Sequence, residues 1–350
     1  MYEFETIAAC HKMLRDMFKV KTGETVAITY DTVSCEKVAE ATAQAAVALG
    51  AKPLLLKMSA PIHKSKMADY ERPYNALYGA LANADIWIEY NCNKTCLCYS
   101  QLFEDVVRDN TNIRYLCNCN CNEGTMVRMI GRQDIPTLVD FYHKIEKAHL
   151  KSKRVHIKSD LGTDFYCDFV PGREMAIADG AYDKPRVAML LGQILWVPEF
   201  ESVNGTMVVD GFMHPLYPTL SNNITLTLEK GLITKFEGGK EAQDLERWMK
   251  SFDDPNVLRT SHASYGMNTG AILCGNEIED ERIWGTILWG FGSISQYMVP
   301  EIPGGYPAKA HSDALLYNCD VWLDDEQFLK KGQVVGPTEE IVELARRIGK

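Results

Sequence analysis

The sequence predicts an α/β protein of two domains: a doubly wound parallel-sheet domain over residues 1–150 and a β-rich α+β domain over residues 151–350. In the first part, short apolar runs alternate with amphipathic patterns of helical period. In the second part, most apolar runs have the length of a strand and follow one another without a helix between them. The length of 350 residues also exceeds what one hydrophobic core usually holds.

The elements of the first part follow a regular order. We expect strands at residues 24–31, 52–58, 84–90 and 112–119, and helices at residues 35–49, 70–82, 99–109 and 134–150. Strands and helices that alternate at this spacing form right-handed β–α–β units, whose strands lie parallel in a sheet covered on both faces. The first strand is followed by ITYDTVSCEK rather than by a Gly-rich dinucleotide or phosphate-binding loop, so this fold does not imply a nucleotide.

The second part is dominated by strand patterns. We expect two strands joined by a turn within residues 153–170, and further strands at 205–213, 223–239, 270–275, 285–292 and 314–325. The pattern at 223–239 contains a Lys-Gly turn and predicts a hairpin. Helices are expected at residues 240–252 and after Pro337. These elements predict an α+β domain, which we expect to carry the metal-binding residues.

Composition and charge restrict the partners. A net charge of −10 and a pI near 5.4 argue against a broad nucleic-acid surface and against docking on anionic lipid. No apolar run approaches the ~18 residues of a membrane span, and the N-terminus lacks the pattern of a signal peptide. The chain has 11 cysteines, which without an export signal are best interpreted as reduced thiols. We therefore expect a cytoplasmic protein without nucleic acid or membrane as partner.

Three residues form a candidate metal site. His311 and Asp313 are two positions apart at the start of an apolar run, so on a strand their side chains share one face. His262 lies among small polar residues in SHASYGMN. Two histidines and a carboxylate are a ligand set of non-haem Fe(II) sites, and the same set can hold Zn or Mn for hydrolysis. The alternative is a strand histidine bonded to a nearby aspartate.

A family resemblance supports the metal hypothesis. The segments GTMVVDG, NITLTLEKGLITKFEGG, FDDPNV, SHASYGMN and AHSDALLYNCDVWLDD form an ordered series. This series resembles the 2,5-dihydroxypyridine 5,6-dioxygenase family, which are non-haem iron enzymes of nicotinate breakdown, and the wider clan of aminopeptidase T-type metallopeptidases. The resemblance implies that His262, His311 and Asp313 hold the metal. The peptidases have Glu at the first of these positions, so His262 favours the dioxygenase.

Two acidic residues resemble the peptidases instead. The resemblance places Glu201 and Glu281 at positions where those enzymes bind metal, whereas a metal-binding peptidase His matches Leu288. The two-metal set is therefore incomplete. The alternative interpretation of both glutamates is an exposed loop carboxylate, which is favoured for Glu281.

The catalytic groups are expected to differ from those of the dioxygenases. The resemblance implies histidines near the substrate that do not bind metal, but the chain has no histidine between 64 and 142 or between 157 and 213, where they would be expected. We expect Tyr99, His214 or Glu201 to replace such a group, and residue types alone do not choose among them.

Three functions remain open from the sequence. The first is an Fe(II)-dependent ring-cleaving dioxygenase, with a small N-heteroaromatic compound and O2 as substrates. In this case Ser264 and Ser312 would help to orient the metal ligands. The second is a Zn- or Mn-dependent hydrolase, either an aminopeptidase or an aminohydrolase, with Glu201 as base or bridging ligand. The third is a metal- or thiol-based sensor. Resemblance to oligomeric relatives implies a homo-oligomer.

Two groups of cysteines motivate the sensor hypothesis. Each group follows a predicted strand of the first domain: Cys92, Cys96 and Cys98 after one strand, and Cys117, Cys119 and Cys121 after the next. The carboxyl ends of parallel strands meet at one edge of a sheet, so these thiols can be neighbours and bind Zn or a cluster. The spacings CxxxCxC and CxCxC match no standard set, which favours structural thiols.

Overall fold

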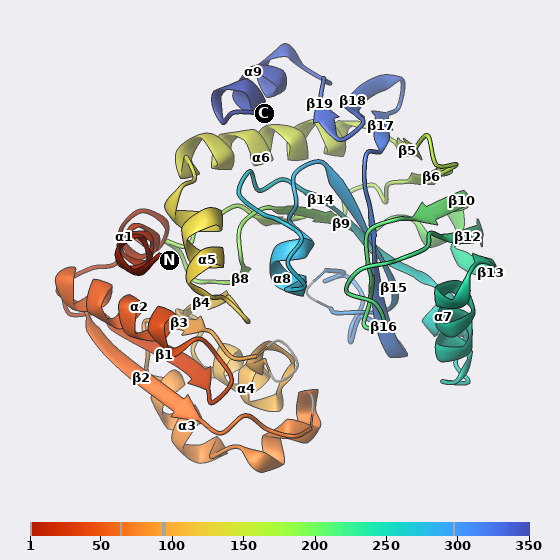
Figure 1. Ribbon diagram of the computed structural model, residues 1–350. Helices are drawn as coiled ribbons and strands as arrows, with labels where there is room; N and C mark the ends of the chain where they lie inside the picture. The colour runs from red at the N-terminus through yellow and green to blue at the C-terminus, as the bar shows by residue number, and fades with distance from the viewer. Residues whose placement is uncertain (1, 64, 93–95, 297) are drawn as a thin grey trace. The chain divides into compact units, whose positions relative to one another are not determined.

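The computed structural model describes residues 2–63, 65–92, 96–296 and 298–350. The chain divides into two compact units, Met1–Ile135 with Ala178–Leu191, and Pro136–Ile177 with Gly192–Lys350. A parallel sheet lies in the first unit and antiparallel sheets lie in the second (Figure 1), which confirms the predicted α/β class.

The first unit is built on a five-stranded sheet of order β2-β1-β3-β4-β8, in which every neighbouring pair is parallel. Its strands are β1 (Thr25–Asp31), β2 (Lys52–Met58), β3 (Ile86–Glu89), β4 (Arg114–Cys117) and β8 (Arg186–Met189). Every residue of β3 and β4 is buried, whereas the edge strand β2 is largely exposed. Central strands that are covered on both faces have continuously apolar sequences. This is why these strands could be predicted.

The helices of the first unit include several irregular turns. They are α1 (Glu3–Lys12), η1 (Met13–Met17), α2 (Glu36–Ala48), η2 (Ser65–Glu71), α3 (Tyr74–Leu81), η4 (Leu97–Tyr99), α4 (Gln101–Asp109), α5 (Glu123–Met126) and η5 (Val127–Gly131). The helix expected at 70–82 begins only at Tyr74, because Pro73 disfavours the helical conformation at the residue before it. Ser100 caps α4 by accepting a hydrogen bond from the backbone N–H of Phe103.

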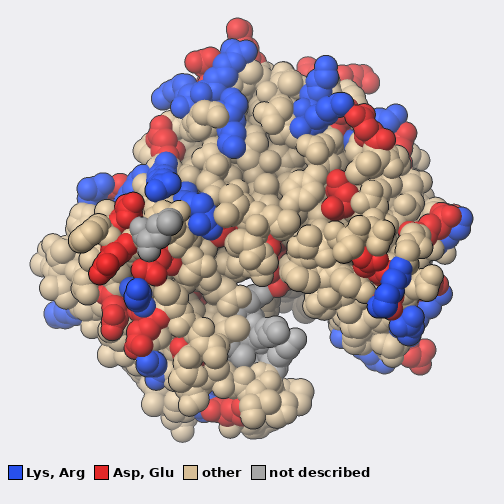
Figure 2. All heavy atoms as spheres, in the orientation of Figure 1, with Lys and Arg blue, Asp and Glu red and all other residues tan. Residues whose placement is uncertain are grey.

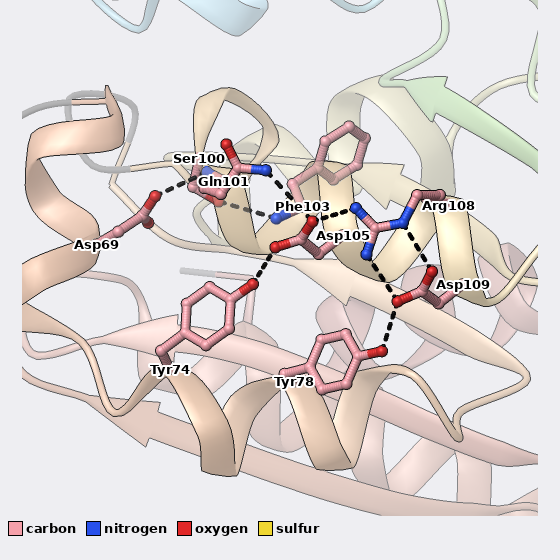
Figure 3. A network of polar contacts seen from close by, with 9 residues as sticks. All are labelled: Asp69, Tyr74, Tyr78, Ser100, Gln101, Phe103, Asp105, Arg108 and Asp109. Carbon is pink, nitrogen blue, oxygen red and sulfur yellow. Dashed lines mark hydrogen bonds and ion pairs between the residues drawn. The ribbon is translucent and has the colours of Figure 1, made fainter.

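A polar network joins α3 to α4 (Figure 3). The Tyr74 hydroxyl donates to Asp105, and the Tyr78 hydroxyl donates to Asp109 at 2.6 Å. Arg108 donates to both carboxylates. The two carboxylates of α4 therefore bind the tyrosines of α3 and the arginine of their own helix. These hydrogen bonds fix α4 against α3.

The second unit contains an eight-stranded sheet of order β13-β12-β10-β6-β5-β17-β18-β19 and a six-stranded sheet of order β11-β16-β15-β14-β9-β7. The first sheet consists of β5 (Arg154–Lys158), β6 (Asp164–Asp168), β10 (Asn204–Val209), β12 (Ile224–Glu229), β13 (Leu232–Gly238), β17 (Asp320–Leu323), β18 (Glu326–Lys330) and β19 (Gln333–Val334). The second consists of β7 (Ala176–Ala178), β9 (Gln193–Trp196), β11 (Met213–His214), β14 (Thr260–Gly266), β15 (Thr286–Ile294) and β16 (Tyr306–Leu316).

Helices of the second unit are few, as expected. They are α6 (Ile135–Lys151), η6 (Phe200–Ser202), α7 (Lys240–Lys250), η7 (Pro255–Leu258), α8 (Glu277–Asp280) and α9 (Glu339–Arg347). The strand predicted at 270–275 was wrong, because this segment forms turns before α8. The Gly270 N–H donates to the Asn268 side chain and the Cys274 N–H to Asp280, so side chains satisfy backbone groups that a neighbouring strand would otherwise bind.

The unit boundary differs from the predicted break at residue 150. Nearly all of α6 belongs to the second unit, and residues 178–191 return to the first. The cause is β8, which extends the parallel sheet by pairing with β4, Arg114 opposite Arg186. The pattern at 186–189 is too short to predict a strand by itself.

The charged side chains are mixed in sign. Figure 2 shows Lys and Arg interspersed with Asp and Glu over the face that it draws. None of the helices in the described parts of the chain is long and apolar enough to span a bilayer.

We expect Ile28→Ala to destabilise the protein, because Ile28 is fully buried on β1 in the middle of the parallel sheet. Loss of its side chain leaves a cavity that costs about 2–5 kcal/mol of unfolding free energy. The measurement is the urea unfolding midpoint. Val47→Ala on α2, where the side chain is 62% exposed, is the control and changes stability by less than about 0.5 kcal/mol. Equal midpoints for the two variants would contradict this description of the core.

Candidate metal centre

Three adjacent strands position the predicted metal ligands. His262 lies on β14, His311 and Asp313 lie on β16, and β15 pairs with both. His311 and Asp313 are two residues apart on one strand, so their side chains share a face. The structure brings all three together: one ligand atom of each lies within 4.8 Å of the others.

Both imidazole rings face the same carboxylate. The distance from His311 Nε2 to Asp313 Oδ2 is 3.0 Å, and that from His262 Nε2 to Asp313 Oδ1 is 3.6 Å. The two rings are nearly parallel, with 6° between their planes and 5.2 Å between their centroids. Two Nε2 atoms and a carboxylate thus converge on one small volume.

Hydrogen bonds orient both histidines. His311 Nδ1 lies 2.8 Å from the carbonyl oxygen of Ser293, which can only accept, so Nδ1 carries a proton and Nε2 is the ring atom left to bind a metal. Ser261 Oγ donates to the same carbonyl at 3.2 Å and lies 3.4 Å from His262 Nδ1. One backbone carbonyl and one hydroxyl therefore leave both Nε2 atoms facing Asp313.

Neither of the serines predicted to orient the ligands forms a hydrogen bond with them among the described residues. Ser264 Oγ accepts a long hydrogen bond of 3.5 Å from Gln193. Ser312 Oγ is buried and makes no hydrogen bond with the described residues. Sequence reasoning missed Ser261, although it stands directly before His262, because a strand neighbour normally points to the opposite face.

Burial and mutual attraction shift the pKa values of the three groups. Burial lowers the pKa of His262 to about 4. Burial would also lower the pKa of His311, but the Asp313 carboxylate raises it to about 9. Burial would raise the pKa of Asp313, but the charge of the His311 ring lowers it to about 2. At neutral pH, Asp313 is a carboxylate and His262 a neutral base, as a metal ion requires, whereas His311 carries a second proton that a bound metal ion would displace.

The donor set fits a divalent cation. Asp313 Oδ1 is buried and accepts no hydrogen bond from the described residues, and an unpaired carboxylate oxygen is costly in the interior. Two imidazole nitrogens and one carboxylate oxygen are the ligands of the 2-His-1-carboxylate type of Fe(II) site, and Zn and Mn accept the same atoms. His262, His311 and Asp313 would hold such an ion.

Gly290 provides the space for this arrangement. It lies opposite Asp313 on β15. A Cβ at this position would lie 2.6 Å from His262 Nδ1, 2.8 Å from its Cε1 and 3.1 Å from Asp313 Oδ1. Contacts this short would displace both ligands, so the site requires glycine here.

A second acidic group approaches Asp313. Carboxylate oxygens of Glu277, Glu281 and Asp313 lie within 4.8 Å of one another. The expectation of an exposed Glu281 was wrong: its side chain is 16% exposed, and Gln193 Nε2 donates to its Oε2 at 2.9 Å. Burial raises the pKa of Glu281 to about 8, and the charge of Asp313 acts in the same direction.

Comparison with known proteins identifies the family. A model of the 2,5-dihydroxypyridine 5,6-dioxygenase family matches residues 5–336. The chain belongs to this family. A 2,5-dihydroxypyridine 5,6-dioxygenase of Pseudomonas putida is 27% identical over 344 residues, which cover 92% of this chain and 93% of the relative. The resemblance predicted from the sequence is therefore confirmed, and the chain is a member of an enzyme family.

Solved structures share the fold. That of 2,5-dihydroxypyridine dioxygenase from P. putida KT2440 matches with a TM-score of 0.78 at 24% identity, covering 96% of this chain and 98% of that one. AmpT from Thermus thermophilus matches with a TM-score of 0.61 at 12% identity, covering 96% and 100%. The predicted relation to the aminopeptidase T-type scaffold is thus borne out at the level of the fold.

The predicted catalytic residues lie in different surroundings. His214 pairs with Asp313 across β11 and β16, its Nε2 is buried without a hydrogen-bond partner among the described residues, and burial lowers its pKa. Glu201 is exposed in η6 and lies in none of the candidate metal groups among the described residues. Tyr99 belongs to the first unit and is 61% exposed. Of the three, His214 is therefore the one that the structure places beside the centre.

We expect Gly290→Ala to abolish metal binding at this centre while the protein stays folded, because the added methyl group collides with the ligands His262 and Asp313. The measurement is metal content per chain after loading and gel filtration. Gly79→Ala is the matched control, since a Cβ at Gly79 on α3 meets nothing within 4 Å. Full metal content in Gly290→Ala would exclude these side chains as the ligands.

Proposed function

We propose that this chain is a mononuclear non-haem iron dioxygenase that opens the ring of a hydroxylated N-heteroaromatic compound of the 2,5-dihydroxypyridine type. The observation that carries this proposal is the convergence of His262, His311 and Asp313 within a chain of that family. Fe(II), when bound by such a set, supplies open coordination positions for the substrate hydroxyl and for O2.

The surrounding residues support binding and proton transfer. His262 and His311 are oriented by Ser261 and the Ser293 carbonyl, so the ligands do not need to reorganise when the substrate enters. Burial keeps His214 neutral at pH 7, and a neutral imidazole can accept the proton that a substrate hydroxyl loses. His214 thus takes the part of the histidines that the sequence lacks elsewhere.

A hydrolase is the second candidate, and one observation favours it. Glu277 and Glu281 lie close enough to Asp313 to share a second cation, as a two-metal hydrolase requires. With Zn or Mn, the metal would activate water. The base proposed for this chemistry from the sequence was Glu201, and its exposed position does not favour that role.

Metal analysis separates the two functions. We expect about one iron per chain in protein purified without oxygen, because three protein ligands suit a single Fe(II). His311→Ala should lose this iron together with O2-dependent turnover of 2,5-dihydroxypyridine. His143→Ala is the control, since His143 is half-exposed on α6 and pairs with Glu146. Loss of zinc or manganese instead of iron in His311→Ala, or loss of two metals together, would favour the hydrolase, and wild-type protein with no metal that depends on His311 would refute both.

Two further variants test the acid–base group. His214→Asn should lower kcat by about 10²-fold or more without changing metal content, which is the usual effect of removing a general base. Glu201→Ala should retain most of the activity, because its side chain lies at the surface. The measurements are steady-state kinetics and elemental analysis of both variants. Near-complete loss of turnover in Glu201→Ala alone would support the hydrolase instead.

A further inference from the structure

Four of the cysteines meet in the first unit, whereas the histidine centre belongs to the second unit. Cys117 ends β4 and Cys119 follows it, while Cys96 and Cys98 lie at η4 after β3. The strands β3 and β4 are parallel neighbours, with Glu89 opposite Cys117. Both segments therefore leave the same edge of the sheet, where α/β proteins bind ligands.

The sulfur atoms are closely spaced. Sγ–Sγ distances are 3.4 Å for Cys96–Cys98, 3.8 Å for Cys98–Cys117 and 3.5 Å for Cys117–Cys119. Four sulfurs bound tetrahedrally to one zinc ion, each at about 2.3 Å, lie about 3.8 Å from one another. An iron–sulfur cluster distributes its cysteines over several irons and spreads them wider. A disulfide requires about 2.05 Å. The spacing of these three consecutive pairs is closest to that of a single ion. Among the described residues, ligand atoms of Glu89, Cys98 and Cys117 all lie within 4.8 Å of one another, and Cys96 and Cys119 each lie beside one of these two sulfurs.

We propose that Cys96, Cys98, Cys117 and Cys119 bind one Zn²⁺ as thiolates, in a structural site separate from the His262/His311/Asp313 centre. On binding, the thiols release their protons to solvent and four zinc–sulfur bonds replace the S–H···S contacts. No oxidant or reductant takes part. The site would join two segments of the first unit that are about twenty residues apart in sequence.

Charged side chains lie beside the cysteine site. Zinc with four thiolates carries a net charge of −2, which is expensive to bury without compensation. The side chain of Arg72, which is 1% exposed and pairs with Asp69, lies close enough for its positive charge to act on Cys96. The carboxyl of Glu89 lies within 4.8 Å of two of the sulfurs.

The protein holds the cysteine segments in place. Asp69 Oδ2 accepts from the backbone N–H of Gln101 at 2.7 Å, and Ser100 caps the same turn (Figure 3). Asp69 also pairs with Arg72 at 2.9 Å. The start of α4, three residues after Cys98, is therefore held by Asp69, which also pairs with Arg72.

The test uses the full-length chain with His311→Ala, so that the histidine centre does not contribute. We compare zinc content after dialysis in this background, with Cys98→Ser/Cys117→Ser added, and with Cys167→Ser/Cys319→Ser added as the control. The control cysteines are both buried, as Cys117 is, and they lie in the second unit, whereas Cys98 is partly buried. We expect about one zinc per chain in the background and the control, and none in the Cys98/Cys117 variant.

Cobalt provides the second measurement, which needs no cysteine variant. Reduced His311→Ala protein loaded with Co²⁺ should show the intense thiolate-to-cobalt charge-transfer absorption and the visible bands of a tetrahedral site. Absence of these bands would overturn the proposal, as would equal zinc content in the Cys98/Cys117 variant and its background. A thiol titration of freshly isolated protein that finds these cysteines oxidised to disulfides, without zinc, would also overturn it.

Discussion

The buried Asp313 carboxylate is the constraint on which the candidate metal centre depends. A negative charge in the interior is stable only with compensating groups around it. The charge of Asp313 raises the pKa of His311. His214 approaches Asp313 from the neighbouring strand β11, and His262 approaches it from β14, on the far side of β15. Its Oδ1 still accepts no hydrogen bond from the described residues. The antiparallel register of β14, β15 and β16 therefore leaves a buried carboxylate oxygen without a hydrogen-bond donor, and one metal cation would compensate its charge.

Much of the fold could be predicted, because central strands and amphipathic helices show their period directly. The four strands expected in the first domain correspond to β1–β4. Other elements depend on partners far away in sequence. The short strand β8 exists because β4 offers a parallel edge, and residues 270–275 are turns because Asn268 and Asp280 bind their backbone. Neither dependence can be seen in a local window.

The candidate metal site could likewise be predicted only in part from the sequence. His311 and Asp313 could be predicted as a pair, since their spacing on a strand fixes a common face. The roles of Ser261, Gly290 and the Ser293 carbonyl follow from register and a strand irregularity near His262, which sequence alone does not give. The exposure of Glu281 was misjudged for a related reason: Glu281 is the C-cap residue of the short helix α8, and its side chain accepts a hydrogen bond from Gln193, which is distant in sequence.

The two candidate metal sites differ in the softness of their donors, and this difference has a consequence for selectivity. Thiolates select Zn, whereas imidazole with carboxylate also suits Fe(II). In an isolated His/His/Asp site, zinc would compete, because divalent zinc generally binds such ligands more tightly than Fe(II) does. A thiolate site elsewhere in the chain does not remove that competition, since each site equilibrates with free metal independently. Iron at the histidine centre would therefore depend on metal supply and on further ligands that complete its coordination, whereas zinc at the thiol site would stabilise the first unit.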